Sequence, residues 1–297
     1  MNIGVIGLGK MGSAIALRLV RGGFTVIGYD LQVQVQIHNE LASHFTQVNL
    51  IEEVAVQATI IWLMVPAGVV DTVITELTPC LNKNSIIIDG GNSHFKDSVR
   101  RYQTLKKLDL NFLDCGVSGG ILGGDTGFSL MIGGDKSIFE QCKTLFEAVA
   151  AVHGYAYCGP SGAGHYVKMV HNGIEYALLE SYAEGFELLH AGEYKNLDLE
   201  KISNIWMHDA IIRSFILSLC ENIFKKDQKL DTISGVVDES GTARWAVEEA
   251  ARHNISVNLI KEALQIRQES HRTGGTYATK LVALLRNAFG GHPFYRK

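Results

Sequence analysis

Short apolar runs rich in β-branched residues alternate with helical stretches over the first 160 residues. The runs are NIGVIG (2–7), TVIGYD (25–30), TIIWLMV (59–65), SIIIDG (85–90), NFLDCG (111–116) and FSLMIGG (128–134). Parallel strands that are connected by crossover helices produce this pattern. The sequence therefore predicts an α/β Rossmann-type N-terminal domain over residues 1–160.

The pattern changes after CGPSGAG (158–164), which is predicted to be a junction. No proline occurs between Pro160 and Pro293, and long segments with helical apolar periodicity fill the interval. These segments are HYVKMVHNGIEYALLESYAEGFELLHAG (165–192), AIIRSFILSLCENIF (210–224) and TYATKLVALLRNAF (276–289). The sequence therefore predicts an all-α C-terminal domain over residues 161–297.

Polar residues share one face of the first of these helices. Because a helix turns by about 100° per residue, KMVHNGIEY brings Lys168, His171, Asn172, Glu175 and Tyr176 to the same side. Apolar residues occupy the other sides, and a helix that is apolar around most of its circumference is normally buried. A buried lysine and glutamate would have perturbed proton affinities, which acid–base chemistry requires. A solvated face and a buried ion pair between helices are the structural alternatives.

Composition restricts the possible partners. The chain has 297 residues, of which 46% are hydrophobic and 20% charged, and a net charge of −4. Basic residues cluster in nothing longer than short pairs such as Lys106-Lys107, so no nucleic-acid or anionic-membrane partner is predicted. The five cysteines are widely spaced without a Cys-x-x-Cys pair, which indicates a reducing compartment and supports neither disulfides nor a zinc site. Without a basic leader or a membrane-spanning apolar run, the sequence predicts a cytoplasmic protein.

A G-x-G-x-x-G motif, Gly7, Gly9 and Gly12, lies directly after the first predicted strand and at the start of a helix. Such a turn lets the backbone approach a pyrophosphate, and the helix N-terminus supplies donors. Asp30 ends the next strand, where a carboxylate accepts from a ribose 2′-hydroxyl and repels a 2′-phosphate. The following LQVQVQ (31–36) has no arginine, so NAD is predicted over NADP. A glycine-rich turn without a ligand is the structural alternative.

Four motifs carry a resemblance to a known family. With GLGKMG (7–12), DGGNS (89–93), DCGVSGG (114–120) and GHYVKMVHNGIEY (164–176), the chain resembles decarboxylating 6-phosphogluconate dehydrogenases of the β-hydroxyacid dehydrogenase superfamily. Its length resembles a short form that lacks much of the helical repeat of the long enzymes. The resemblance implies NAD-dependent oxidative decarboxylation of 6-phospho-D-gluconate to D-ribulose 5-phosphate and CO2, in the pentose phosphate pathway and gluconate utilization.

The resemblance also implies residue roles. Lys168 would be the general base and later acid, Glu175 the second acid, and no metal would be needed. The implied substrate-binding residues are Asn92, Ser118, Gly119, Gly120, His171, Asn172, Tyr176, Thr242, Arg267, Arg286 and His292. The expected cofactor-binding residues are Gly7, Leu8, Gly9, Lys10, Met11, Gly12, Asp30, Val65 and Asn92.

The chemistry explains why a buried lysine is needed. Lysine acts as a base only if its neutral form is populated, and burial near another cation lowers its pKa. In the implied reaction, the charged Lys168 would protonate or polarise the ketone oxygen after hydride has left carbon 3, and CO2 would then be lost. Glu175 then assists protonation at carbon 1. A 3-hydroxyacid dehydrogenase without decarboxylation and a non-catalytic dinucleotide-binding sensor are the competing functions.

Two departures from the family and one tail motif complete the expectations. Ser240 stands where long enzymes carry a phosphate-binding lysine, which leaves Arg244 or another cation for the phosphate. Members that use NADP have an arginine after the second strand, where this chain has Asp30 and Leu31. The tail RNAFGGHPFYRK (286–297) is implied to complete a neighbouring subunit's site in a homodimer. A tail that folds onto its own chain is the alternative.

Overall fold

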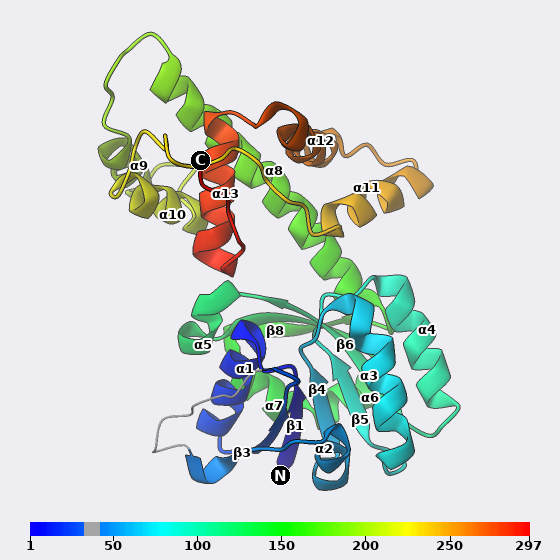
Figure 1. Cartoon of the computed structure of the whole chain (residues 1–297). Coiled ribbons are helices and arrows are strands. Elements are labelled where there is room, and N and C mark those ends of the chain that lie inside the picture. Colours follow the sequence, from blue (N-terminus) through cyan, green and yellow to red (C-terminus); the bar gives the residue numbers. More distant parts are fainter. Residues whose placement is uncertain (33–41) are drawn as a thin grey trace. The chain divides into compact units, whose positions relative to one another are not determined.

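The computed structural model describes residues 1–32 and 42–297, and the chain forms two compact units, Met1–Met169 and Val170–Lys297 (Figure 1). The division falls within helix α8 (Ala163–Ala191), so both units share one continuous helix. All five cysteines are free. None of the helices in the described ranges has the length and apolarity needed to cross a membrane.

The first unit contains one eight-stranded sheet. Its strands are β1 (Asn2–Ile6), β2 (Thr25–Tyr29), β3 (Phe45–Gln47), β4 (Ile60–Leu63), β5 (Ile86–Asp89), β6 (Asn111–Ser118), β7 (Phe128–Gly134) and β8 (Ala150–Gly159). They lie in the order β3-β2-β1-β4-β5-β6-β7-β8. All six predicted strands are present, whereas β3 and β8 were not predicted from the sequence. The Rossmann-type fold class is confirmed, and the order reverses between β1 and β4, where such sheets bind ligands.

The expectation of purely parallel strands is wrong at one position. β6 and β7 pair antiparallel, with Leu113 opposite Gly134 and Ser118 opposite Ser129. The connection over residues 119–127 holds only a short 3₁₀ turn and α5 (Gly123–Thr126). A parallel pair needs a crossover of a dozen or more residues, so this shorter connection reverses the chain direction.

Alternate strand residues face two separate cores. Ile60 and Trp62 of β4 pack with helices α1 (Lys10–Arg21), α6 (Lys136–Gln141) and α7 (Lys143–Val149). Ile61 and Leu63 pack on the other face with α2 (Ile51–Gln57), α3 (Val70–Leu77) and α4 (Phe95–Lys106). Side chains of a strand point alternately to the two faces, so near-continuous apolar runs predict this burial on both sides. The sheet is thereby a rigid platform for the loops at its edge.

The second unit is helical, as predicted. After α8 come α9 (Leu199–Met207), α10 (Phe215–Phe224), α11 (Thr242–Arg252), α12 (Asn258–Thr273) and α13 (Tyr277–Gly290). The core unites Leu179 and Phe186 of α8 with apolar residues of α10 and α13. Helix α10 begins later than AIIRSFILSLCENIF predicts, because the Ser214 hydroxyl accepts from the Leu217 N–H at 3.0 Å and caps the helix there.

The C-terminal tail returns along its own unit. The Ser234 N–H donates to the Tyr295 carbonyl at 2.9 Å, and the Lys297 N–H donates to the Thr232 carbonyl at 3.0 Å. The Tyr295 hydroxyl also donates to Asp238 at 3.1 Å. The end of the chain is therefore held to residues 232–238 of the same unit.

Candidate active site

The glycine motif forms the turn from β1 into α1. Gly7 has a φ of 90°, in the left-handed region that glycine adopts most easily. A Cβ on Gly12 would lie 1.8 Å from the Gly7 carbonyl oxygen, so only glycine fits there. A Cβ on Gly9 would meet nothing within 4 Å, which leaves space for a ligand against the backbone. This geometry fits a pyrophosphate at the N-terminus of α1.

Asp30 directly follows β2 and is held at the glycine turn. One carboxylate oxygen accepts from the Leu8 N–H at 2.6 Å and the other from the Gln32 N–H at 2.8 Å. The Leu8 side chain is buried in the core, so Leu8 offers only its backbone to this turn. Of the stretch LQVQVQ (31–36), which contains no arginine, residues 33–36 lie outside the described residues. A fixed carboxylate at this place suits a ribose hydroxyl.

Other expected ligand-binding residues follow the neighbouring parallel strands. Lys10 and Met11 begin α1, and Val65 follows β4. Asn92 lies in the loop after β5, has a φ of 53°, and its side-chain oxygen is buried without a hydrogen-bond partner among the described residues. Ser118 ends β6. Because carboxyl ends of parallel strands meet at one edge, these residues share the edge that carries the glycine turn.

The glycines after Ser118 change the direction of the chain. Gly119 has a φ of 130° and Gly120 a φ of 60°. A residue with a Cβ is strained in the first of these conformations, so this turn requires glycine. Its role in binding substrate stays a prediction.

Lys168 lies in the second turn of α8 and is only 6% exposed. A Cβ on Gly116 of β6 would lie 2.4 Å from the Lys168 Cβ, so the helix rests directly on the sheet. Asp114, two residues earlier on the same strand face, accepts from the Gly162 N–H at 2.6 Å and from the His165 N–H at 2.9 Å. These bonds satisfy donors at the start of α8 and fix where Lys168 lies.

The expectation that α8 is buried around most of its circumference is wrong for this chain. Val170, Ile174 and Leu178 are 38%, 52% and 45% exposed. They are four residues apart and form one stripe, whereas the core of the second unit takes Leu179 and Phe186 from another side of the helix. The helix therefore has a buried side, a polar side and an open apolar side.

In the second unit, the predicted polar residues form one hydrogen-bond network. The Asn172 amide donates to the Thr242 hydroxyl at 3.3 Å and its oxygen lies 3.1 Å from His171 Nδ1. The Ser240 hydroxyl lies 3.0 Å from that of Thr242. The Ser240 N–H donates to the Tyr176 hydroxyl at 3.1 Å. The structure thus brings together residues from α8 and from the start of α11.

Two buried arginines lie beside Tyr176. The guanidinium carbon of Arg267 lies 3.3 Å from the centre of the Tyr176 ring, and its Nη2 has no hydrogen-bond partner within the described ranges. Burial, and then the nearby Arg267, lower the pKa of Arg286. Arg244, by contrast, is 53% exposed at its side chain and pairs with Glu239. Arg286 is thus buried beside Arg267, whereas Arg244 is exposed and paired, and the binding role of either arginine stays a prediction.

His292 lies beyond the end of α13. Its carbonyl oxygen accepts from the Asn287 amide at 2.8 Å, and its ring lies 6.1 Å from that of Phe289. Glu175 is half-buried on α8, one residue before Tyr176. The roles assigned to both residues stay predictions.

Sequence reasoning missed Glu180, a buried carboxylate on α8. Its Oε1 lies 3.5 Å from the Arg267 Nε, too far for a good hydrogen bond. Burial raises the pKa of Glu180 to about 7, although Arg267 acts in the opposite direction. Its position one helical turn after Tyr176 was the only signal in the sequence.

Glu180→Gln is expected to remove a pH dependence of stability. Between the ordinary value of 4.5 and about 7, the folded state binds more protons at Glu180 than the unfolded state does. The contribution of Glu180 to the free energy of unfolding therefore falls as the pH rises from 4.5 to about 7, and stays constant at higher pH. Relative to wild type, the free energy of unfolding of Glu180→Gln should rise by about 2–3 kcal/mol between pH 5 and 8. Urea unfolding at both pH values measures this difference, with Glu193→Gln, which changes an exposed carboxylate, as control. Parallel pH curves for wild type and Glu180→Gln would contradict the prediction.

Comparisons with known proteins cover nearly the whole chain. The family profile described as the NAD binding domain of 6-phosphogluconate dehydrogenase matches residues 2–159. The profile of the C-terminal domain of 6-phosphogluconate dehydrogenase matches residues 164–287.

Several relatives are similar over long alignments. An NAD(+)-dependent, decarboxylating 6-phosphogluconate dehydrogenase of Haloferax volcanii is 40% identical, covering 100% of this chain and 99% of that protein. The Bacillus subtilis enzyme of the same description is 37% identical over 90% of this chain but only 60% of its own length. This difference agrees with the short form expected from the sequence.

Solved structures agree with the fold. The Plasmodium falciparum 6-phosphogluconate dehydrogenase has a TM-score of 0.79 at 30% identity, covering 91% of this chain and 62% of that one. The Mycobacterium tuberculosis 3-hydroxyisobutyrate dehydrogenase has a TM-score of 0.72 at 20% identity, covering 97% and 98%, and shows the shared fold alone. With both family profiles matched and full-length relatives at 40% identity, the chain belongs to the 6-phosphogluconate dehydrogenase family.

Proposed function

We propose that the protein catalyses NAD-dependent oxidative decarboxylation of 6-phospho-D-gluconate to D-ribulose 5-phosphate and CO2. The observation that carries this proposal is helix α8, which presents a buried lysine, Lys168, and Glu175 two turns later on the same face. Family membership and the fit of the glycine turn to a dinucleotide support it.

Lys168 is the proposed base. Held against Gly116 by the capped start of α8, its amine takes the proton from the hydroxyl of carbon 3. When bound, NAD supplies the acceptor for the hydride that leaves the same carbon. The protonated Lys168 then donates to the ketone oxygen. This oxygen takes up the electron pair of the bond between carbon 1 and carbon 2, and carbon 1 leaves as CO2.

Glu175 is the proposed acid for the last step. The enediol left by decarboxylation needs a proton at carbon 1 of the product, which was carbon 2 of the substrate, while its enol hydroxyl returns a proton to the Lys168 amine. The side chain of Glu175 shares the helix face of Lys168 and donates the proton to carbon 1. Asn172 and Thr242, already hydrogen-bonded to each other, supply polar groups for the sugar hydroxyls.

The phosphate is proposed to bind at Tyr176. The two buried guanidiniums, of Arg267 and Arg286, concentrate positive charge there, and the Ser240 and Thr242 hydroxyls add donors. Because Arg286 is buried in the same unit as Arg267, we assign both arginines to one chain's site. Homodimerisation, and the contribution of a partner's His292, remain predictions.

A coupled assay tests the function. Purified protein is given 6-phosphogluconate with either cofactor, while the absorbance of reduced cofactor and the released CO2 are both recorded. Equal amounts of the two products support the proposal. Reduced cofactor without CO2 would indicate a 3-hydroxyacid dehydrogenase, and no turnover would favour a dinucleotide-binding sensor.

Cofactor choice is expected to follow Asp30. Wild-type kcat/KM should be higher with NAD than with NADP, since the fixed carboxylate repels a 2′-phosphate. At separations of a few ångströms such repulsion amounts to several kcal/mol at most, so Asp30→Ala should narrow the ratio about tenfold or more. Asp30→Asn keeps an acceptor for the Leu8 N–H and serves as the matched variant that removes charge alone. A wild-type preference for NADP would overturn this assignment.

A further inference from the structure

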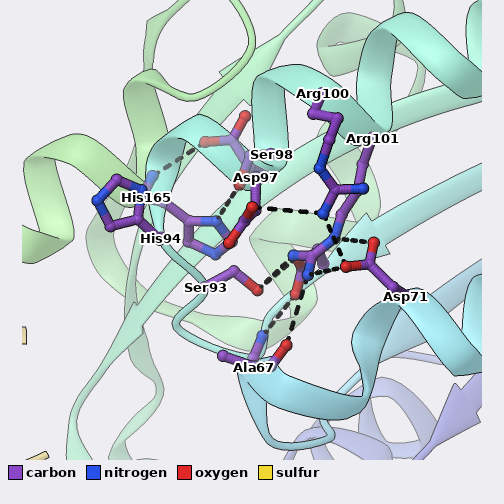
Figure 2. Close-up of polar contacts among 12 residues, drawn as sticks. Ala67, Asp71, Ser93, His94, Asp97, Ser98, Arg100, Arg101 and His165 are labelled. Atoms are coloured by element: carbon purple, nitrogen blue, oxygen red, sulfur yellow. Dashed lines mark hydrogen bonds and ion pairs between the residues drawn. The ribbon is translucent and has the colours of Figure 1, made fainter. Parts of the chain in front are cut away.

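Helix α4 contacts two parts of the first unit that carry residues of the predicted site, the proposed base Lys168 and the predicted binding residue Asn92. Its buried residues Ser98 and Arg101 point to different partners, as Figure 2 shows. Ser98 contacts the start of α8, which carries Lys168. Arg101 contacts the loop after β5, which carries Asn92.

Arg101 is held by several acceptors, of which Asp89 and Ser93 are buried and the Asp71 side chain is half exposed. Its Nη1 donates to Asp89 at 3.0 Å and to the Ser93 hydroxyl at 2.8 Å. Its Nε donates to Asp71 at 2.9 Å, and its hydrogen bonding keeps the pKa of Asp71 at about 2. Its Nη2 also donates to the Ala67 carbonyl at 3.4 Å. A planar guanidinium with several donors can bind all these acceptors at once, which a lysine ammonium cannot do with the same geometry.

Asp89 closes the loop that Arg101 holds. Its Oδ1 accepts from the Gly91 N–H at 3.0 Å, and its Oδ2 accepts from the Ser93 hydroxyl at 2.7 Å. Asn92 lies between Gly91 and Ser93, in a left-handed conformation and with its side-chain oxygen buried. The direction of Asn92 therefore depends on the bonds made by Asp89, Ser93 and Arg101.

Ser98 makes the corresponding contact to α8. Its hydroxyl lies 2.7 Å from Nδ1 of His165, which precedes Lys168 by about one helical turn. The His165 N–H donates to Asp114, so both the side chain and the backbone of this residue are fixed. A Cβ on Gly162 would lie 2.8 Å from Val99, which shows how closely α4 approaches the start of α8.

We propose that α4 is the positioning element of the reaction centre, with Arg101 fixing the loop of Asn92 and Ser98 fixing the helical turn of Lys168. Both act through other residues, so they are positioning residues. The expected changes in kcat rest on the proposed function, whereas the expected changes in amide hydrogen exchange do not. It identifies residues outside the substrate and cofactor contacts on which turnover depends.

Arg101→Gln and Arg100→Gln form a matched pair for the first contact. Both remove one positive charge next to Asp71, but the Arg100 side chain is 54% exposed and that of Arg101 is 3% exposed. Amide hydrogen exchange of residues 89–93 should become about tenfold faster in Arg101→Gln and stay unchanged in Arg100→Gln. Should Arg101→Gln fail to fold, Arg101→Lys, which keeps the charge but not the planar set of donors, replaces it. Equal exchange in wild type and the Arg101 variant would overturn the proposal.

Kinetics separate positioning from general structure. A misplacement of about 1 Å costs about 10²-fold in rate, so kcat of Arg101→Gln should fall by about that factor. In an Asn92→Ala background, Arg101→Gln should lower kcat by less than about a further threefold. The effects of two substitutions do not add when one residue acts through the other. Fully multiplicative losses would show that Arg101 does not act through Asn92, and would overturn this half of the proposal.

Ser98→Ala and Thr104→Val form the pair for the second contact. Each removes one hydroxyl from α4, and within the described part of the chain that of Thr104 donates to the Arg100 carbonyl of its own helix alone. Ser98→Ala should lower kcat about tenfold, shift the acidic limb of its pH profile, and leave NAD affinity unchanged. If Ser98→Ala left both the pH profile and the amide hydrogen exchange of residues 163–169 unchanged, this half of the proposal would be overturned. If wild type does not turn over 6-phosphogluconate, the proposed function fails, and the exchange measurements alone decide the positioning role.

Discussion

Lys168→Ala is expected to abolish hydride transfer while NAD binding stays largely intact. The amine is the proposed base for the hydroxyl of carbon 3, and general base catalysis typically contributes about 10²–10⁴-fold. We expect kcat to fall by about 10³-fold or more, measured as reduced cofactor in stopped flow, with NAD affinity measured by calorimetry. The cofactor turn is built from residues of β1, α1 and β2, so its geometry does not depend on this side chain.

Controls for this prediction come from the same region of the chain. Lys195→Ala removes an exposed lysine just after α8, whose ammonium donates to the backbone carbonyls of Ala191 and Gly192, and should leave kcat unchanged. Glu175→Gln should permit hydride transfer and slow the later protonation of carbon 1, whereas the exposed Glu184→Gln should not. Turnover near the wild-type level in Lys168→Ala would refute the proposed mechanism.

Gly116→Ala is expected to damage both stability and catalysis. The added methyl group would lie 2.4 Å from the Lys168 Cβ and 3.0 Å from the Gly164 carbonyl oxygen, and neither atom is the end of a flexible side chain. Helix α8 must then move away from β6 or the sheet must distort. Overpacking of this kind costs about 1–3 kcal/mol of stability. Displacement of the amine by about 1 Å should lower kcat by about 10²-fold.

Gly185→Ala on the same helix is the matched control. A Cβ there would meet nothing within 4 Å, and alanine is a better helix former than glycine by about 1 kcal/mol. This variant should be slightly more stable than wild type and equally active. Urea unfolding and steady-state kinetics of both variants test the pair, and wild-type kcat in Gly116→Ala would contradict the role of close packing under Lys168.

The apolar pattern was sufficient to predict most of the first unit. Burial on both sheet faces requires residues such as Ile60, Ile61, Trp62 and Leu63 to be apolar in succession, and that requirement is local. Strand β8 was missed because its alternating residues, including Tyr155 and Tyr157, are only partly buried and follow a short helix. The antiparallel direction of β7 depends on the short connection between β6 and β7. The apolar pattern within β7 carries no information about the length of that connection.

The glycine motif, Asp30 and the polar face of α8 were also readable from sequence, because each depends on spacing within one turn or one helix. Turn geometry determines where a residue without a Cβ is needed, and the helical period determines which side chains share a face. Cofactor preference and the tail's role in a partner subunit remain predictions, since they depend on ligands and chains beyond this one.

Only the tertiary structure decided what surrounds these residues. Arg267 is 91 positions from Tyr176 in sequence, yet its guanidinium covers the tyrosine ring, and Glu180 gains its raised pKa from the burial that this packing creates. Likewise, Asp114 of β6 and Ser98 of α4 both contact the start of α8, and Arg101 of α4 contacts the Asn92 loop. A sequence pattern determines local conformation and which residues are buried. Which buried charge meets which partner depends on contacts between distant segments, and these exist only once the chain has folded.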